Sequence, residues 1–391
     1  MARRSSWSAF AIVALLAGAG SVVVAQQPSS STAPRVLPPT YPWETEPLDA
    51  IYGHLAEGAF QEPIGVFFEP KARELYVADS RNGLIGIFDE GRIPVFTFGG
   101  PSKLVEPRAV VATAEGNLYV LDAQQSELHA FNYRGEPQTP LRFVRPPRDV
   151  KPPKTTGAFP LKPVAQDPKA PPRTGRVTTP AKPEEPKPVG AYLRIGAFSR
   201  DAGGRWYVGD LDEGRVIVYD KELRFLRELE ASKRAVSFHT PVDIAVSSTG
   251  LVAVADMQGT PALHVYDADG RLLSAFGERD IGLMNFTAPA AVAWDEQGFL
   301  YALDLLRHDV KVFTAKGEFV HHFGGWSTPE TRGRAPGELL YPADIAIDPK
   351  GPIYIAERFG QRVQAFVRKP KPEPEKRAGA PAAAAPNAPK K

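Results

Sequence analysis

The chain of 391 residues contains no cysteine, three methionines and only seven histidines. The lack of cysteine excludes disulfides, thiolate metal sites, c-type haem attachment and lipid modification of an N-terminal cysteine. Beyond the first 25 residues, the sequence also lacks an apolar run long enough to cross a membrane. With 43% hydrophobic and 24% charged residues, the remaining composition is that of a globular protein.

The first 25 residues have the three parts of a secretory signal peptide. Arg3 and Arg4 precede an apolar run of roughly 17 residues, and Val-Val-Ala precedes Gln26. We therefore predict cleavage after Ala25 and export to the periplasm or the extracellular space. The alternative is an uncleaved anchor, but the run is short for a hydrocarbon layer about 30 Å thick.

The 40 prolines are concentrated in three segments. Residues 26–45 form a Ser/Pro/Gln-rich leader, residues 145–190 contain 13 prolines, and residues 369–391 form a Lys/Pro/Ala tail. Such segments bury too little apolar surface to offset the entropy lost on ordering. The sequence thus predicts a signal peptide over 1–25, three disordered segments, and a folded part over 46–368 that contains the 145–190 insertion.

The folded part is a repeat of six copies. The copies share an apolar strand, a glycine turn, an apolar strand ending in an acid, a polar turn and a third apolar strand. A proline precedes the first strand in every copy except the third. In four copies the acid follows the proline by 15 residues, and in five copies a fourth strand follows. The segments up to the acid are 63–79, 107–122, 193–210, 241–256, 289–304 and 342–357.

The copies repeat with a period of 43–53 residues, and four short strands in a period of this size are typical of one blade of a β-propeller. The sixth copy lacks a fourth strand, whereas residues 47–55, ahead of the first copy, have the pattern of one. The sequence therefore predicts an all-β, six-bladed β-propeller of four-stranded antiparallel blades, in which residues 47–55 pair with residues 362–367. Closing the ring in this way removes an exposed strand edge.

The repeat resembles the NHL repeat. The resemblance rests on Pro-x-Asp/Gly-(apolar)-Ala-(apolar)-Asp, then Gly, Tyr-(apolar)-Ala-Asp, Arg-Val-x-(apolar)-Phe and Phe-Gly-Gly, most clearly in residues 286–325 and 323–367. It covers roughly 46–144 and 191–368. It implies a propeller but does not fix a function, because NHL propellers include protein-binding and RNA-binding modules, extracellular sensors and an amidating lyase.

The resemblance also implies where a catalytic metal would lie, since the lyase of this family has histidine ligands at the starts of its innermost strands. Zinc requires three or four convergent ligands. The sequence has no nucleophile elbow and no phosphate-binding loop. We therefore predict no catalytic residue, no metal ligand and no cofactor, with a structural Ca²⁺ as the open alternative. In this sequence the starts of the innermost strands, where the lyase has its histidine ligands, contain no histidine. These positions are Ile64-Gly65, Val242-Asp243, Ala290-Ala291 and Ala343-Asp344.

Candidate binding residues lie at the starts of innermost strands and on loops. Asp243 and Asp344 follow the repeat proline by two residues, near one mouth of the central channel, and Arg108 has a similar place. They are interpreted as a polar ligand-binding cluster or, alternatively, as a solvated channel rim. Among the long connections 277–288 and 325–341, the second contains Trp326 and Arg332, which are residue types favoured at binding hot spots.

The acids that end the second strands have a different interpretation. Because every copy has one, we expect each to accept hydrogen bonds from backbone N–H groups of the turn that follows, and not to bind cations. These acids are Asp79, Asp122, Asp210, Asp256, Asp304 and Glu357.

The distribution of charge argues against a nucleic-acid partner. The whole chain carries +2, and residues 1–25, 145–190 and 369–391 carry +2, +6 and +4, which leaves −10 for the leader and propeller. Nucleic-acid binders normally have a basic folded domain.

The sequence favours a non-catalytic scaffold that binds a protein or peptide on one propeller face. The basic segments contact anionic envelope polymer or act as spacers. The alternatives are a metal-dependent lyase or hydrolase with a divalent ion in the channel, and a ligand sensor.

Overall fold

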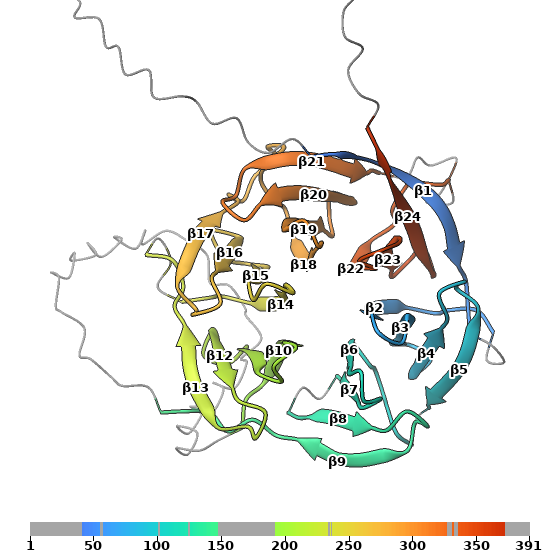
Figure 1. The fold of residues 1–391 in the computed structure, drawn as a ribbon, viewed down its shortest axis with the longest axis horizontal. Coiled ribbons are helices and arrows are strands. Elements are labelled where there is room, and N and C mark those ends of the chain that lie inside the picture. The colour runs from blue at the N-terminus through green and yellow to red at the C-terminus, as the bar shows by residue number, and fades with distance from the viewer. Residues whose placement is uncertain are drawn as a thin grey trace, which may run out of the picture. The chain divides into compact units, whose positions relative to one another are not determined.

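The repeat copies fold as a propeller ring of six four-stranded antiparallel sheets, as predicted (Figure 1). The computed structural model describes residues 41–54, 58–100, 102–123, 126–147, 192–233, 235, 237–326, 331 and 335–371. The predicted signal peptide, most of the leader, most of the insertion and the tail after Lys371 lie outside the described residues. Within the described ranges, no helix has the length and apolar content to span a membrane.

The first five blades are each built from four consecutive strands, with the first strand nearest the centre of the ring (Figure 1). Blade 1 contains β2 (Pro63–Glu69), β3 (Glu74–Asp79), β4 (Leu84–Phe88) and β5 (Pro94–Gly99). Blade 2 contains β6 (Ala109–Ala112), β7 (Leu118–Leu121), β8 (Leu128–Phe131) and β9 (Pro137–Leu141). Blade 3 contains β10 (Ile195–Arg200), β11 (Trp206–Asp210), β12 (Arg215–Tyr219) and β13 (Phe225–Leu229).

The second half of the ring repeats this order. Blade 4 contains β14 (Pro241–Val246), β15 (Val252–Asp256), β16 (Leu263–Tyr266) and β17 (Leu272–Phe276). Blade 5 contains β18 (Pro289–Trp294), β19 (Phe299–Asp304), β20 (Asp309–Thr314) and β21 (Phe319–Gly324). Blade 6 contains β22 (Pro342–Ile347), β23 (Ile353–Glu357), β24 (Arg362–Pro370) and, as its outermost strand, β1 (Trp43–Ile51).

The ring is closed by β1, which pairs with β24 from Trp43 opposite Pro370 to Ile51 opposite Val363. The predicted pairing of the N-terminal segment with the last blade is therefore confirmed. Its bounds differ, because the strand starts at Trp43 and not at residue 47. The partner strand β24 continues to Pro370, beyond the predicted end at residue 367. Its last residues need backbone hydrogen-bonding partners, and residues 43–46 of β1 supply them.

The core lies between neighbouring blades. Ala253 of blade 4 packs in one apolar cluster with Val292 of blade 5, and Val66 of blade 1 packs in another with Tyr354 of blade 6. Second and third strands are covered on both faces, and β11 and β12 are buried along their whole length. Outermost strands such as β17 are largely accessible. The cost of exposing a strand edge is thus confined to the rim.

The repeated acids tie each blade to the connection that precedes it. Asp304 Oδ2 and Oδ1 accept hydrogen bonds from the backbone N–H groups of Thr287 and Ala288, at 2.7 and 3.0 Å. The turn that follows contributes longer bonds, from Leu306 and Arg307 at 3.2 Å. The expected structural role is present, but the main donors precede the blade. The reason is the antiparallel register, in which the acid lies opposite the repeat proline at the start of the blade.

Candidate functional site

One face of the ring carries both the connections between blades and the turns between second and third strands, because successive strands of a blade run in opposite directions. We call this face the loop face. It includes the two connections that the sequence singled out, 277–288 and 325–341, together with the turns 305–308 and 358–361. Binding residues on this face would be presented by a rigid scaffold.

A row of four aromatic rings crosses the loop face where blades 5 and 6 meet. The ring of Trp326 stacks on His308 with centroids 4.1 Å apart, and His308 lies 4.8 Å from Tyr341. Tyr341 contacts Phe359 edge-on at 5.0 Å. Trp326 and Phe359 are 64% and 53% exposed, whereas His308 is buried. We call these four residues the aromatic stripe; its outer rings are accessible and its inner rings support them.

His308 has a backbone conformation that most side chains avoid. Its φ is 57°, and it directly precedes the third strand of its blade, where blades 1 and 3 have Gly83 and Gly214 at φ 67° and 60°. A left-handed conformation costs a non-glycine residue about 1 kcal/mol. Burial lowers the pKa of His308, so its ring is neutral at pH 7. The neutral imidazole ring of His308 therefore stacks under Trp326 although the left-handed backbone conformation at His308 is unfavourable.

A cavity of about 350 Å³ opens on the loop face where blades 6, 1 and 2 meet. Arg358 donates from Nε and Nη2 to Glu62 Oε2, at 3.1 and 3.0 Å, and Arg81 lies 3.5 Å from Glu62 Oε1. Arg108 is exposed and has no ion pair or side-chain hydrogen bond with any described residue. We call this the arginine cavity; its lining residues are Glu62, Ile64, Ser80, Arg81, Glu106, Arg108 and Arg358.

Asp243 and Asp344 link inner strands of different blades. Asp243 Oδ2 accepts from the backbone N–H of Val292 at 2.7 Å, which joins blade 4 to blade 5. Asp344 Oδ2 accepts from the N–H of Val66 at 2.8 Å, which joins blade 6 to blade 1. The other oxygen of each accepts from the N–H of the following residue. Both candidates therefore occupy the innermost layer of the ring and connect neighbouring blades.

Both of these carboxyls have raised pKa values. Burial raises the pKa of Asp243 to about 6, although its two backbone hydrogen bonds favour the charged form. Burial also raises the pKa of Asp344 well above its usual range, and the charge of Asp243 raises it further. No cationic side chain counters either shift. The channel thus contains two acids that repel each other when both are ionised.

This pair makes stability depend on pH. Because burial raises the folded pKa of Asp243 from 3.8 to about 6, its protonated form stabilises the fold at low pH, and about 3 kcal/mol of this stability is lost as pH rises from about 4 through 6. The raised pKa of Asp344 acts in the same direction. We expect Asp243→Asn/Asp344→Asn to flatten the fall in unfolding free energy between about pH 4 and pH 7. Denaturant titrations at several pH values measure it. Asp269→Asn, at an exposed turn, is the control, and an unchanged slope in the double variant would contradict the assignment.

The described residues do not form a metal centre. No three His, Asp or Glu side chains among them are grouped so that they could hold a metal ion. Asp243 and Asp344 supply two carboxylates, and each oxygen already accepts a backbone N–H group. Zinc requires three or four ligands and calcium six to eight oxygens. The side-chain donors therefore do not fit the divalent ion that the lyase alternative requires.

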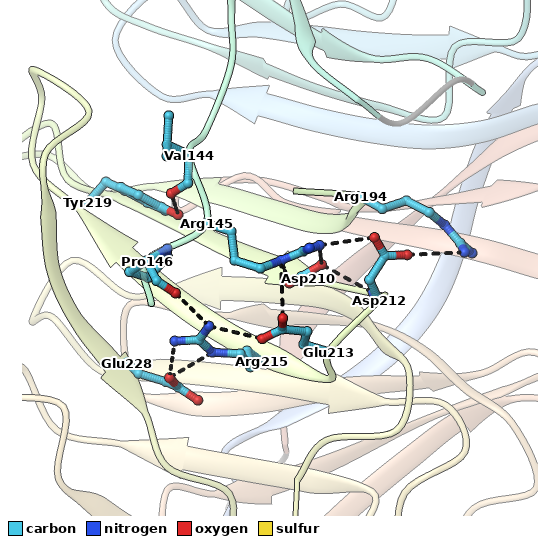
Figure 2. A network of polar contacts seen from close by, with 10 residues as sticks. All are labelled: Val144, Arg145, Pro146, Arg194, Asp210, Asp212, Glu213, Arg215, Tyr219 and Glu228. Atoms are coloured by element: carbon cyan, nitrogen blue, oxygen red, sulfur yellow. Dashed lines mark hydrogen bonds and ion pairs between the residues drawn. The ribbon is translucent and has the colours of Figure 1, made fainter. Parts of the chain in front are cut away.

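A polar network on blade 3 anchors the start of the insertion (Figure 2). Arg145 donates from Nε and Nη2 to the two oxygens of Asp210, at 2.8 and 3.0 Å, and from Nη2 to Asp212 at 3.0 Å. The side chains of Arg145 and Asp210 are 9% and 0% exposed. In this blade an arginine side chain of the preceding connection thus binds the repeated acid, whereas in the other blades backbone N–H groups of that connection bind it.

The end of the insertion lies beside its start. Val144 and Tyr192 form a β-bridge, and the N–H of Leu193 donates to Phe143 O at 3.0 Å. The hydroxyl of Tyr219 donates to Val144 O at 2.9 Å (Figure 2). The insertion therefore leaves and rejoins the ring at one point, and the order of the blades is preserved.

The structure brings part of the predicted site together. Arg108 lies in the arginine cavity and Trp326 in the aromatic stripe, both on the loop face. Asp243 and Asp344 lie in the innermost layer, and Arg332 lies outside the described residues. The other three residues of the aromatic stripe, and the arginines Arg81 and Arg358 of two turns, were not predicted. Among them, only His308 stands out in the sequence, because blades 1 and 3 have glycine at the equivalent position.

Comparisons with known proteins support the fold. No protein-family model matches the chain, and no curated protein matches it. A Bacteroides thetaiotaomicron protein of unknown function is 12% identical, with a TM-score of 0.52 over 84% of this chain and 76% of that one. The β-propeller domain of Cps50 (Swd1) from Myceliophteria thermophila is 13% identical, with a TM-score of 0.51 over 83% of this chain and 99% of that one.

Virginiamycin B lyase from Staphylococcus aureus is also similar in structure, at 10% identity and a TM-score of 0.48 over 83% of this chain and 99% of that one. The two similarities with TM-scores above 0.5 show a shared propeller fold, and at these identities they show nothing about activity.

Proposed function

We propose that the chain is a non-catalytic scaffold that binds a peptide or protein on the loop face of an NHL-type propeller. The observation that carries this proposal is the aromatic stripe, in which exposed Trp326 and Phe359 are supported by two further rings. Tryptophan and tyrosine dominate binding hot spots because they supply large, rigid contact areas. The backbone strain at His308 and at Tyr341, whose φ is 51°, is in keeping with a functional surface.

A second apolar surface on the same face supports binding of a protein. In the connection 277–288, Ile281 is 87% exposed and Met284 57% exposed. The connection is held in one conformation, because Asp280 accepts hydrogen bonds from the N–H of Gly282 and the side chain of Asn285. Rigid presentation of apolar side chains lowers the entropy lost on binding.

The location and the accessory contacts are part of the same proposal. The N-terminal pattern supports export to the periplasm or the extracellular space, and the basic segments 145–190 and 369–391 would contact anionic envelope polymer. The alternative of a metal-dependent lyase or hydrolase draws only on Asp243 and Asp344, whose donor set does not fit the ion.

A blocked aromatic peptide tests the binding surface. We expect acetyl-Phe-Ala-Phe-amide to bind weakly, and Trp326→Ala/Phe359→Ala to reduce its affinity about tenfold, because both rings are lost from the contact. NMR titration of the labelled protein measures the affinity. The control is Phe225→Ala, which removes a ring that is 49% exposed on the outer strand of blade 3. Equal binding by the double variant and the control would refute the proposal.

A further inference from the structure

We propose that the arginine cavity binds the terminal carboxylate of a peptide whose aromatic side chains lie on the aromatic stripe. This inference rests on the proposed function and names the group that its ligand must carry. It is drawn from the unpaired charge, the net charge, the size and the position of the cavity.

Arg108 supplies the unpaired charge. The other two arginines of the cavity are engaged with Glu62, Arg358 through two hydrogen bonds and Arg81 through a longer contact. Arg108 has no such partner among the described residues, although Glu106 lies two positions away and also lines the cavity. A guanidinium group has paired donors that match the two oxygens of a carboxylate.

The net charge of the cavity fits a monoanion. Three arginines and two glutamates give the lining a net charge of +1. One carboxylate balances this charge, whereas a phosphate, which is close to a dianion at neutral pH, leaves an excess of negative charge beside Glu106. The hydroxyl of Ser80 adds a neutral donor to the lining. The same chemistry could reach the cavity from a peptide C-terminus or from an acidic side chain.

The size of the cavity favours a chain end. Its volume of about 350 Å³ lies near the lower end of the usual range for ligand pockets, about 300–1,000 Å³. This volume is enough to hold a terminal residue together with its carboxylate.

The cavity is continuous with the aromatic stripe. Arg358 lines the cavity, and its guanidinium lies 5.4 Å from the ring centre of Phe359. The backbone N–H of Arg358 donates to Tyr341 O at 3.1 Å, which fixes the turn against the stripe. A peptide with an aromatic side chain on Phe359 therefore lies next to Arg358, at the edge of the cavity that Arg108 also lines.

Three matched peptides test the inference. Acetyl-Phe-Ala-Phe with a free carboxylate is expected to bind the intact protein about tenfold more tightly than acetyl-Phe-Ala-Phe-amide, at low ionic strength where the charge is least screened. Acetyl-Phe-Ala-Phe-Asp-amide carries the carboxylate on a side chain. Tighter binding of this peptide than of the free acid would overturn the assignment to a chain end. Inorganic phosphate is added as a competitor, and displacement of the free acid at lower concentration than acetate would overturn the preference for a monoanion.

Variants separate the cavity from the stripe. Arg108→Ala is expected to remove the advantage of the free acid and leave binding of the amide unchanged, and Arg108→Lys to retain part of it, because lysine keeps the charge without the paired donors. The control is Arg271→Ala, which removes a 77% exposed arginine from a turn on the opposite face. If the amide binds and the free acid gains nothing, the inference fails and the proposed function stands. If neither peptide binds, the proposed function fails as well.

Discussion

Replacement of Ile51 by aspartate is expected to lower the free energy of unfolding by about 4 kcal/mol, since it places a charge in an apolar core. Ile51 is 8% exposed and packs with Val66 and Val363, residues of blades 1 and 6. A loss of this size lowers the melting temperature by roughly 10 °C in a domain of this length. Calorimetry and denaturant titration measure both quantities.

The matched control for this prediction is Leu48→Asp on the same strand. Leu48 is 46% exposed, so a charge there remains in contact with water. We expect a change within about 0.5 kcal/mol, as is usual for surface substitutions. If both variants lost similar amounts of unfolding free energy, burial of Ile51 between blades 1 and 6 would not be what holds β1 in the ring.

Replacement of Lys311 by methionine is expected to destabilise the protein by about 3–5 kcal/mol, the usual cost of leaving buried charges without a partner. Lys311 is fully buried in blade 5, with its Nζ 2.6 Å from Asp309 and 3.6 Å from Asp304. The ammonium group also lies 4.9 Å from the ring centre of Phe286. Methionine retains the length of the side chain but removes the ammonium group that both carboxylates share, and only Asp309 keeps another cation, Arg307 at 3.5 Å.

Lys316→Met is the matched control, because Lys316 is exposed in a turn of the same blade. Denaturant titration of both variants measures the difference. The double variant Lys311→Met/Asp309→Asn removes both members of the closest buried ion pair and keeps Asp304 for its backbone hydrogen bonds, so part of the lost stability should return. A single variant as stable as the control would show that the buried lysine does not balance these acids.

The architecture could be predicted because the repeat constrains it at every copy. A fixed spacing between proline and acid, such as Pro289 to Asp304, reflects two residues that lie opposite each other in the blade. An incomplete last copy then required a strand from elsewhere, and only the segment before the first copy had the right pattern. The length of β1 could not be predicted, since Trp43–Glu46 have no regular alternation of apolar and polar residues.

The candidate site could be predicted only in part, because it is assembled from separate connections. His308, Tyr341 and Phe359 come from three segments that have no pattern in common, and they meet only because blades 5 and 6 are neighbours. The partner of Asp210 was likewise hidden, because Arg145 falls at the edge of a segment whose composition predicted disorder. Residues with the same structural role in every copy can be predicted from the repeat, whereas residues that occur in one copy only have no such pattern.

The closing strand sets the order in which the protein can mature. Ile51 and Val363 are paired although more than 300 residues separate them. As the ribosome makes the chain, β1 emerges before every other strand of the ring and its partner emerges last, so β1 must wait unpaired. Contacts of such long range slow folding. For the export proposed above, the final blade can therefore form only after translocation of the whole ring, and a chain released early would keep an open edge.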